Sequence, residues 1–122
     1  MLTVETYAAS SAIHGIGLFA AQFIPKGTLM WRFQPGLDVI VPHALANDLP
    51  PGGKEFLRHY AYLSEFFPGG WVLNCDNSRF INHSETPNTD NRTEFAYAAR
   101  DIQKDEEITC NYGEFCQDFE GV

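Results

Sequence analysis

The most informative ten residues of this chain read Arg79-Phe80-Ile81-Asn82-His83-Ser84-Glu85-Thr86-Pro87-Asn88. Its Asn, Ser and Thr residues have short polar side chains, which hydrogen-bond readily to nearby backbone groups. Their density predicts an ordered, non-repetitive loop whose polar groups are satisfied internally. A rigid surface loop and a functional loop both fit this stretch when it is considered alone.

A second informative block follows downstream and reads Glu106-Glu107-Ile108-Thr109-Cys110-Asn111-Tyr112-Gly113. Tyr112 comes at the end of an expected strand and is followed by glycine, which presents its phenol where the backbone turns away. A core tyrosine whose hydroxyl is hydrogen-bonded fits the same pattern.

Short strands separated by frequent turns are expected over the rest of the chain. Pro and Gly mark breaks at 25–27, 35–36, 50–53 and 68–70. Aromatic and branched residues predict strands at 28–33, 37–41, 71–73, 95–99 and 108–112. In the first of these, Leu29, Trp31 and Phe33 share one face. Helical spacing over 56–67 and a shorter helix over 42–49 complete a mainly β protein with a small helical insert.

Gly15-Ile16-Gly17 is a lone GxG near the start of the chain. It lacks the third glycine and the following helix of a dinucleotide-binding fingerprint. A tight turn between two strands is the simplest interpretation of these residues.

The composition excludes several classes of protein. Eight Lys and Arg against 16 Asp and Glu give a formal charge of −8, which argues against direct nucleic-acid binding and favours either a basic partner or no strongly charged partner at all. No apolar run reaches the ~20 residues of a membrane-spanning helix, and the N-terminus lacks the features of a secretory signal. Three cysteines without a CxxC pair favour a reducing compartment. We therefore expect an intracellular protein, cytoplasmic or nuclear, that does not bind membranes.

Taken in order, the blocks resemble the SET-domain protein lysine methyltransferases. The resemblance covers about 13–33 and 71–113, and Asn-His-Ser-x-x-Pro-Asn at 82–88 is its most specific motif. It implies one SET domain over 1–122, built of several short sheets, with a variable insert at about 43–70. It also implies that the C-terminal segment threads, knot-like, past the segment that bears Asn82 and His83.

The resemblance implies S-adenosylmethionine as cofactor and methyl transfer to a lysine in a basic protein tail. Residues implied to contact the cofactor are His14, Gly15, Ile16, Gly17, Trp71, Asn82, His83 and Phe115. Glycine would let backbone approach the ligand without an intervening Cβ. Trp71 takes the place of a common tyrosine, and its indole N–H cannot accept a hydrogen bond.

Tyr112 matches the tyrosine that the family uses at the transfer site. A lysine amine must be neutral to attack a methyl group, and an apolar channel beside a positive charge lowers the pKa of that amine. Tyr112 is expected to orient the amine rather than to act as a base, because a phenol pKa near 10 is poorly matched to that task. Cys110 occupies a substrate-side position where relatives often carry an aromatic residue, so di- or trimethylation is one hypothesis.

Two departures from the family pattern are visible. Glu85 stands where many members have cysteine, and the C-terminal zinc-binding cysteine cluster is missing, so no metal is expected. Phe115 or Phe119 is a candidate to close the cofactor pocket instead. A homodimer that completes a peptide groove is a further expectation from the small size of the domain.

Two other interpretations compete with this one. A metal or thiol enzyme would need a recognisable ligand spacing or a pair such as Cys75 with His83, and nothing in the sequence orients that histidine. A catalytically inactive SET-like module that binds peptides is the second alternative, and binding of S-adenosylmethionine would discriminate against it.

Overall fold

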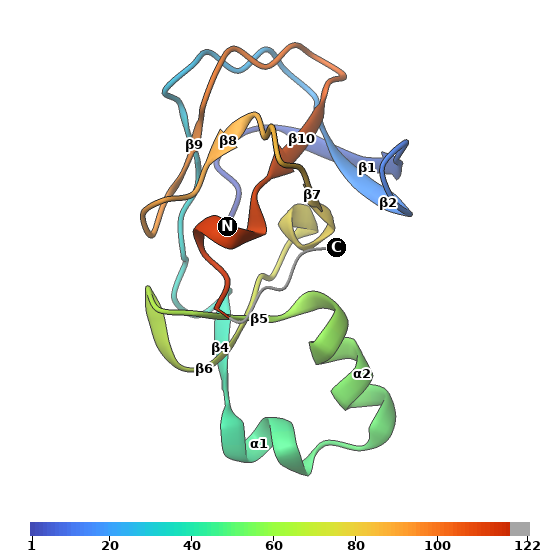
Figure 1. Ribbon diagram of the computed structural model, residues 1–122, viewed down its shortest axis with the longest axis vertical. Helices are drawn as coiled ribbons and strands as arrows, with labels where there is room; N and C mark the ends of the chain where they lie inside the picture. The colour runs from blue at the N-terminus through green and yellow to red at the C-terminus, as the bar shows by residue number, and fades with distance from the viewer. Residues whose placement is uncertain (118–122) are drawn as a thin grey trace.

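The computed structural model describes residues 1–117 as short strands in three small sheets, with two α-helices at one end (Figure 1). The strands are β1 (Thr6–Ser10), β2 (Ile16–Ala20), β3 (Leu29–Trp31), β4 (Val39–Pro42), β5 (Tyr62–Ser64), β6 (Phe67–Leu73), β7 (Asn82–His83), β8 (Thr89–Asp90), β9 (Ala96–Ala98) and β10 (Glu107–Cys110). The helices are α1 (His43–Asp48) and α2 (Pro51–Tyr60), with 3-10 turns η1 (Asn77–Phe80) and η2 (Tyr112–Glu114). The predicted mainly β fold with a helical insert is confirmed.

The sheet that carries the two sequence blocks has the order β1-β2-β10-β7. Strand β10 pairs antiparallel with β2 and parallel with β7, where Thr109 lies opposite Asn82 and Cys110 opposite His83. Two segments that are far apart in the sequence therefore lie side by side, and the Tyr112 block ends beside the Asn82–His83 pair. The apolar core behind them is formed by Leu18, Ala20, Ile24, Met30, Ala98, Ile102 and Ile108.

The second and third sheets have the orders β3-β9-β8 and β4-β6-β5. The segment at 43–70 holds α1, α2, β5 and the start of β6, and Figure 1 shows both helices together at the lower end of the molecule, below β4, β5 and β6. Within residues 1–117, no helix is long and apolar enough to span a membrane.

The predicted helix over 56–67 is wrong in its second half. Helix α2 ends at Tyr60, because Ala61 is extended and its N–H bonds back to the Leu57 carbonyl. Residues 62–64 instead pair with β6. Sheet pairing with a neighbouring strand outweighs the helical spacing of the apolar residues here.

The break predicted at 68–70 is also wrong, because β6 runs through these residues. Gly69 and Gly70 have φ values of +112° and +159°, and a Cβ on Gly70 would overlap the Val41 carbonyl of β4. Glycine here allows close approach of a neighbouring strand rather than ending the strand.

Other strand boundaries differ by a few residues from the sequence prediction. Strand β3 has an irregular register. Two consecutive residues of this strand, Met30 and Trp31, are both buried, so the strict alternation predicted over 28–33 is wrong. The strand expected to reach Tyr112 ends at Cys110, since the Asn111 side chain accepts the Gly113 N–H at 2.9 Å and starts η2.

Candidate active site

Tyr112 is held at both ends of the residue. Its hydroxyl donates to the Ile81 carbonyl at 2.6 Å, and its backbone N–H donates to His83 Nδ1 at 3.1 Å. The His83 and Tyr112 rings are 5.2 Å apart. Burial, together with the nearby Cys110 and Cys116 thiols, raises the pKa of Tyr112 above that of an ordinary phenol. The phenol is therefore fixed in place and protonated at neutral pH.

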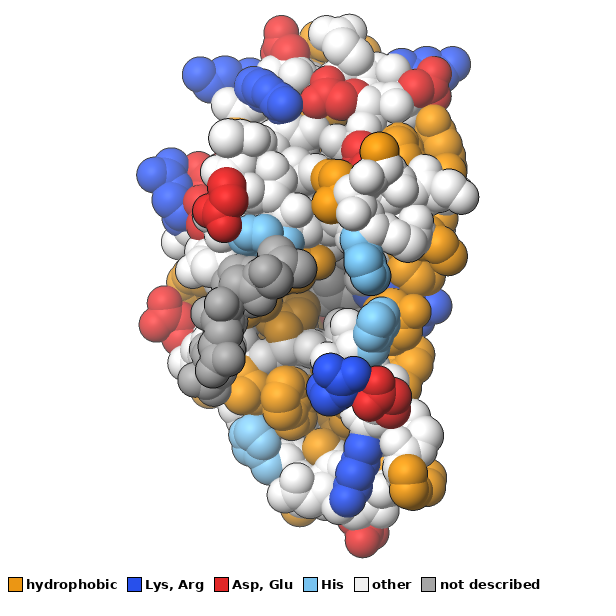
Figure 2. All heavy atoms as spheres, turned by 45° about the vertical axis from the view of Figure 1, so that its right-hand side comes forward, with side chains coloured by type: hydrophobic (Ala, Val, Ile, Leu, Met, Phe, Trp, Pro, Cys, Tyr) orange, Lys and Arg blue, Asp and Glu red, His pale blue; other side chains and the backbone are white. Residues whose placement is uncertain are grey.

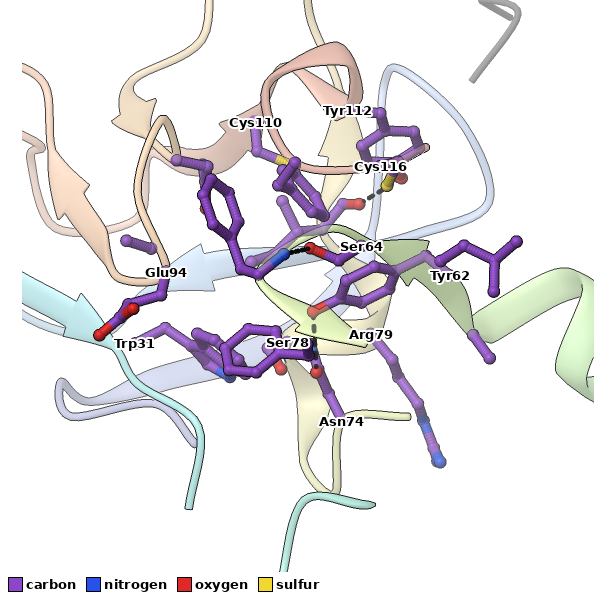
Figure 3. Close-up of a pocket in the computed structure, with 18 of the residues that line it drawn as sticks. Trp31, Tyr62, Ser64, Asn74, Ser78, Arg79, Glu94, Cys110, Tyr112 and Cys116 are labelled. Atoms are coloured by element: carbon purple, nitrogen blue, oxygen red, sulfur yellow. Dashed lines mark hydrogen bonds between the residues drawn. The ribbon is translucent and has the colours of Figure 1, made fainter. Parts of the chain in front are cut away.

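A cavity of about 420 Å³ lies on the ring side of Tyr112, between the β-rich part and the helical insert (Figure 3). Three other residues predicted for the site line it with Tyr112, namely Trp71, Cys110 and Phe115. Figure 2 shows hydrophobic side chains in the hollow between these two parts. Further aromatic residues in the wall are Trp31, Tyr62, Phe66, Phe67 and Phe95.

Within residues 1–117, charged groups are sparse in the cavity wall. They are Arg58, Arg79 and Glu94, with His59 beside them. Arg58 is already paired with Glu55, and the Arg79 guanidinium lies 5.2–5.9 Å from three aromatic ring centres. A wall that combines aromatic rings with few charges suits a cationic ligand group, because ring faces attract cations without a carboxylate.

The other predicted cofactor residues do not line this cavity and form a polar cluster beside it. The Asn82 Nδ2 group lies 3.0 Å from the His14 carbonyl and 3.4 Å from the Ile16 carbonyl. Asn82 is only 8% exposed, so these bonds tie strand β7 to the loop before β2. Asn82 and the loop at 14–17 therefore lie side by side, and their contact with a cofactor stays a prediction.

Ser11 and Glu107 complete this cluster, although no pattern in the sequence predicts a role for either residue. Ser11 Oγ lies 2.8 Å from both carboxylate oxygens of Glu107, and Asn82 Nδ2 lies 3.1 Å from one of them. Hydrogen bonds to a carboxylate are stronger than those between neutral groups. The position of Glu107 five residues before Tyr112 was visible in the sequence, but its partner Ser11 is 96 residues away.

Glycine is needed at the two positions of the GxG turn for different structural reasons. Gly15 has a φ of +46°, and no atom lies within 4 Å of an added Cβ. At Gly17, a Cβ would lie 2.5 Å from Glu107 Oε2. Gly15 therefore provides the turn, whereas Gly17 provides room for the Glu107 carboxylate. The close approach expected at Gly17 is thus to a side chain of the protein itself.

His83 links the polar cluster to the cavity. Its ring is held between the Tyr112 N–H at Nδ1 and Glu85 Oε1, 3.1 Å from Nε2. Cys75 has a different surrounding, because its own N–H donates to Asp38 Oδ1 at 2.9 Å. Partial desolvation and the nearby Asp38 raise the pKa of the Cys75 thiol, which opposes its use as a nucleophile with His83 as base.

Thiol and metal chemistry find little support elsewhere in the site. Burial raises the pKa of Cys116 to about 12 and that of Cys110 well above its ordinary value, so both thiols stay protonated. Among residues 1–117, no group of three or more His, Cys, Asp or Glu side chains could hold a metal ion.

Two aromatic features of the cavity bear on the sequence predictions. Phe115 packs edge-on against Tyr62 with ring centres 5.2 Å apart and lines the cavity, and its role in closing a cofactor pocket stays a prediction. Phe119, the other candidate for closing the pocket, lies outside the described residues. Trp31 also lines the cavity, and the sequence did not predict it as a site residue, although it lies on the expected aromatic face of 28–33. Its buried indole N–H has no acceptor within the part of the chain described.

Comparisons with known proteins agree with this geometry. A model of the SET domain matches residues 15–113. No curated protein matches the chain. A candidate histone methyltransferase of Plasmodium falciparum is 24% identical, with a TM-score of 0.64, and the match covers 92% of this chain and 96% of that one.

Two structures of polycomb repressive complex 2 are also similar. The complex from Chaetomium thermophilum is 24% identical with a TM-score of 0.68, over 98% of this chain. A ctPRC2 structure bound to S-adenosylmethionine is 25% identical with a TM-score of 0.68, over 94% of this chain. This chain spans only 16% of the length of each of those two chains. The SET-domain model covers most of the sequence, from the GxG turn to the glycine after Tyr112, and the chain belongs to the SET-domain family.

Proposed function

We propose that this protein transfers a methyl group from S-adenosylmethionine to the side-chain amine of a lysine in another protein. The observation that carries the proposal is Tyr112, whose phenol is fixed at the wall of an aromatic cavity beside the Asn82 cluster. Membership of the SET-domain family and a similar structure bound to S-adenosylmethionine support it.

The residues present fit that cofactor. Its sulfonium is a cation, and the aromatic wall around Trp71 and Phe115 suits a cation. The loop at Gly15 leaves open space where a side chain would stand, so backbone atoms of residues 14–17 can contact a ligand. Asn82 and His83 would hold it from strand β7, and Trp71 and Phe115 from the cavity wall.

When bound, the cofactor would supply the methyl group. The lysine nitrogen would form the new bond to the methyl carbon while the carbon–sulfur bond breaks and leaves its electron pair on sulfur. The methylated amine would then release its surplus proton to solvent. With the sulfonium already occupying the aromatic wall, a second positive charge in the same apolar cavity would be disfavoured by repulsion and by desolvation, which lowers the pKa of the lysine amine. Tyr112, whose pKa is raised, remains a phenol and positions the amine. A fixed oxygen of this kind lowers the barrier by orientation and electrostatic support rather than by accepting the proton.

A basic peptide segment is the proposed acceptor. The chain carries a charge of −8, which attracts basic partners over long range. Glu94 in the cavity wall gives a local carboxylate for such a segment, whereas Arg58 is already paired with Glu55. Methylation of matched basic and acidic lysine peptides tests this proposal. A preference for acidic peptides would contradict it.

Thermal unfolding with and without S-adenosylmethionine separates an enzyme from a module that only binds peptides. Cofactor at 100 times its Kd should add about 2.7 kcal/mol to the free energy of unfolding. Absence of any shift at high concentration would favour the peptide-binding alternative. Labelled methyl transfer into a whole-cell lysate would then identify acceptor proteins.

A further inference from the structure

Glu85 is the residue at which this chain departs from the common Asn-His-Ser-Cys pattern of its family, and its carboxylate contacts the site. Its Oε1 lies 3.1 Å from His83 Nε2. The local chain folds to allow this contact, because Ser84 Oγ accepts the Thr86 N–H at 3.0 Å and turns the backbone at residue 85. The Glu85 side chain is 84% exposed, whereas that of His83 is 6% exposed.

The two ring nitrogens of His83 have opposite roles in this arrangement. Nδ1 accepts the backbone N–H of Tyr112 at 3.1 Å, so it carries no proton. A neutral imidazole has its proton on one nitrogen, and that proton is therefore on Nε2, facing the Glu85 carboxylate. Glu85 stabilises the tautomer that the Tyr112 N–H requires.

The opposite tautomer would disturb Tyr112. With the proton on Nδ1, two N–H groups would face each other and the Tyr112 N–H would lose its acceptor. This N–H belongs to the first residue of η2, just after β10, and the Tyr112 hydroxyl is bonded to Ile81 at the other end of the side chain. Loss of the backbone bond would remove one of the two hydrogen bonds described above that hold Tyr112 in place.

We propose that Glu85 is a positioning residue that acts through the His83 tautomer to hold Tyr112 in place for methyl transfer. The expected effect on methyl transfer rests on the proposed function, whereas the orientation of His83 by Glu85 rests on the geometry alone. It assigns a role to the carboxylate that replaces cysteine at this position.

The test combines two variants of Glu85 with one control. Glu85→Ala removes the carboxylate that faces Nε2–H, and Glu85→Gln keeps an oxygen acceptor there without the charge. Glu5→Ala changes net charge equally at an exposed glutamate outside the site. Nitrogen-15 NMR of labelled histidine reports the His83 tautomer, with His14, His43 and His59 assigned from their glutamine variants. Steady-state kinetics on a lysine peptide report kcat and the KM for S-adenosylmethionine.

We expect wild type, Glu85→Gln and Glu5→Ala to keep His83 in the Nε2–H form with similar kcat. Glu85→Ala should populate the Nδ1–H form and lower kcat about two- to fivefold, the effect of an exposed pair, with the KM for the cofactor unchanged. An unchanged tautomer or a wild-type kcat in Glu85→Ala overturns the proposal. Should the wild type transfer no methyl group, the proposed function fails, and the tautomer alone still decides whether Glu85 orients His83.

Discussion

The hydroxyl of Tyr112 donates a hydrogen bond to the main-chain carbonyl of Ile81, with 2.6 Å between the two oxygens. This bond directs the hydrogen of the phenol toward the protein, so lone pairs of its oxygen are the part left to face an incoming amine. Ile81 precedes the Asn82–His83 pair, so the same short segment aligns the phenol and carries the residues expected to hold the cofactor. The position of the Tyr112 phenol and that of Asn82 and His83 therefore both depend on the backbone at 81–83.

Tyr112→Phe should abolish most methyl transfer while leaving cofactor binding nearly intact. Removing a fixed oxygen at a transfer site typically costs about 10²-fold or more in kcat. The lost hydrogen bond to Ile81 should cost about 1 kcal/mol of unfolding free energy. Kinetics and calorimetric titration with S-adenosylmethionine check both effects, with Tyr97→Phe as a control. Loss of cofactor binding together with activity would show that the phenol is structural.

Gly17→Ala should weaken cofactor binding and destabilise the fold. The added Cβ would lie 2.5 Å from the Glu107 carboxylate, which also holds Ser11 and Asn82. Overpacking of this kind costs about 1–3 kcal/mol. Gly52→Ala is the matched control, since its Cβ meets no atom within 4 Å and the site is helical. Denaturant unfolding of both variants is the measurement, and an equal response would contradict the role given to Gly17.

The stability of the protein should depend on pH through Asp38. This buried carboxylate accepts hydrogen bonds from the N–H groups of Gln34 and Cys75 and lies 2.7 Å from the Met1 ammonium group. Burial alone would raise the pKa of Asp38, but these bonds outweigh it and the pKa is lowered. The ionised carboxylate therefore stabilises the fold above the ordinary aspartate pKa of about 3.9, and the gain is lost as pH falls through the lower folded value.

Asp38→Ala makes this dependence measurable. Asp38 is buried but its Met1 partner is 44% exposed, so the variant mainly loses hydrogen bonds to a charged group, which cost about 1.5–3 kcal/mol, and it should be less stable than wild type at neutral pH. The difference should shrink as the solution is acidified below the ordinary aspartate pKa, about 3.9. Urea unfolding of both proteins across this range provides the comparison. A difference that stays constant with pH would mean that the charge of Asp38 contributes nothing.

Cys110 should permit more than one methyl group on the acceptor lysine. Its side chain is 4% exposed and lies in the cavity wall with Tyr112. A thiol is small, so it leaves volume that an aromatic ring would fill. Mass spectrometry of peptide incubated to completion with the wild-type protein should reveal di- or trimethyl-lysine. A product that stops at one methyl group would remove this hypothesis.

The sequence predicted the parts of the site whose residues are close together in the chain. Asn82 and His83 stand in one dense motif, and the parallel pairing of β7 with β10 does place them beside the Tyr112 block. The position of a strand in the chain is encoded locally, by the turn residues at its ends and by the alternation of apolar and polar side chains along it. The order of the blocks carried the family resemblance, and the family model confirms it.

The sequence could not predict contacts that depend on distant chain segments. Ser11 and Glu107 meet across 96 residues, and neither is distinguished by spacing or composition. The two glycines at 69–70 looked like a break, but their conformations let β4 approach β6 closely. In both cases the deciding interaction is tertiary, and tertiary packing overrides local preference.

Transfer of a labelled methyl group from S-adenosylmethionine to a basic lysine peptide tests the central claim most directly. The same peptide with lysine replaced by arginine keeps its charge and serves as the control, and mass spectrometry locates the added group. We predict methylation of the lysine peptide alone, and its near loss with Tyr112→Phe. Absence of transfer to any lysine peptide or lysate protein, with cofactor bound to the folded protein, would contradict the account.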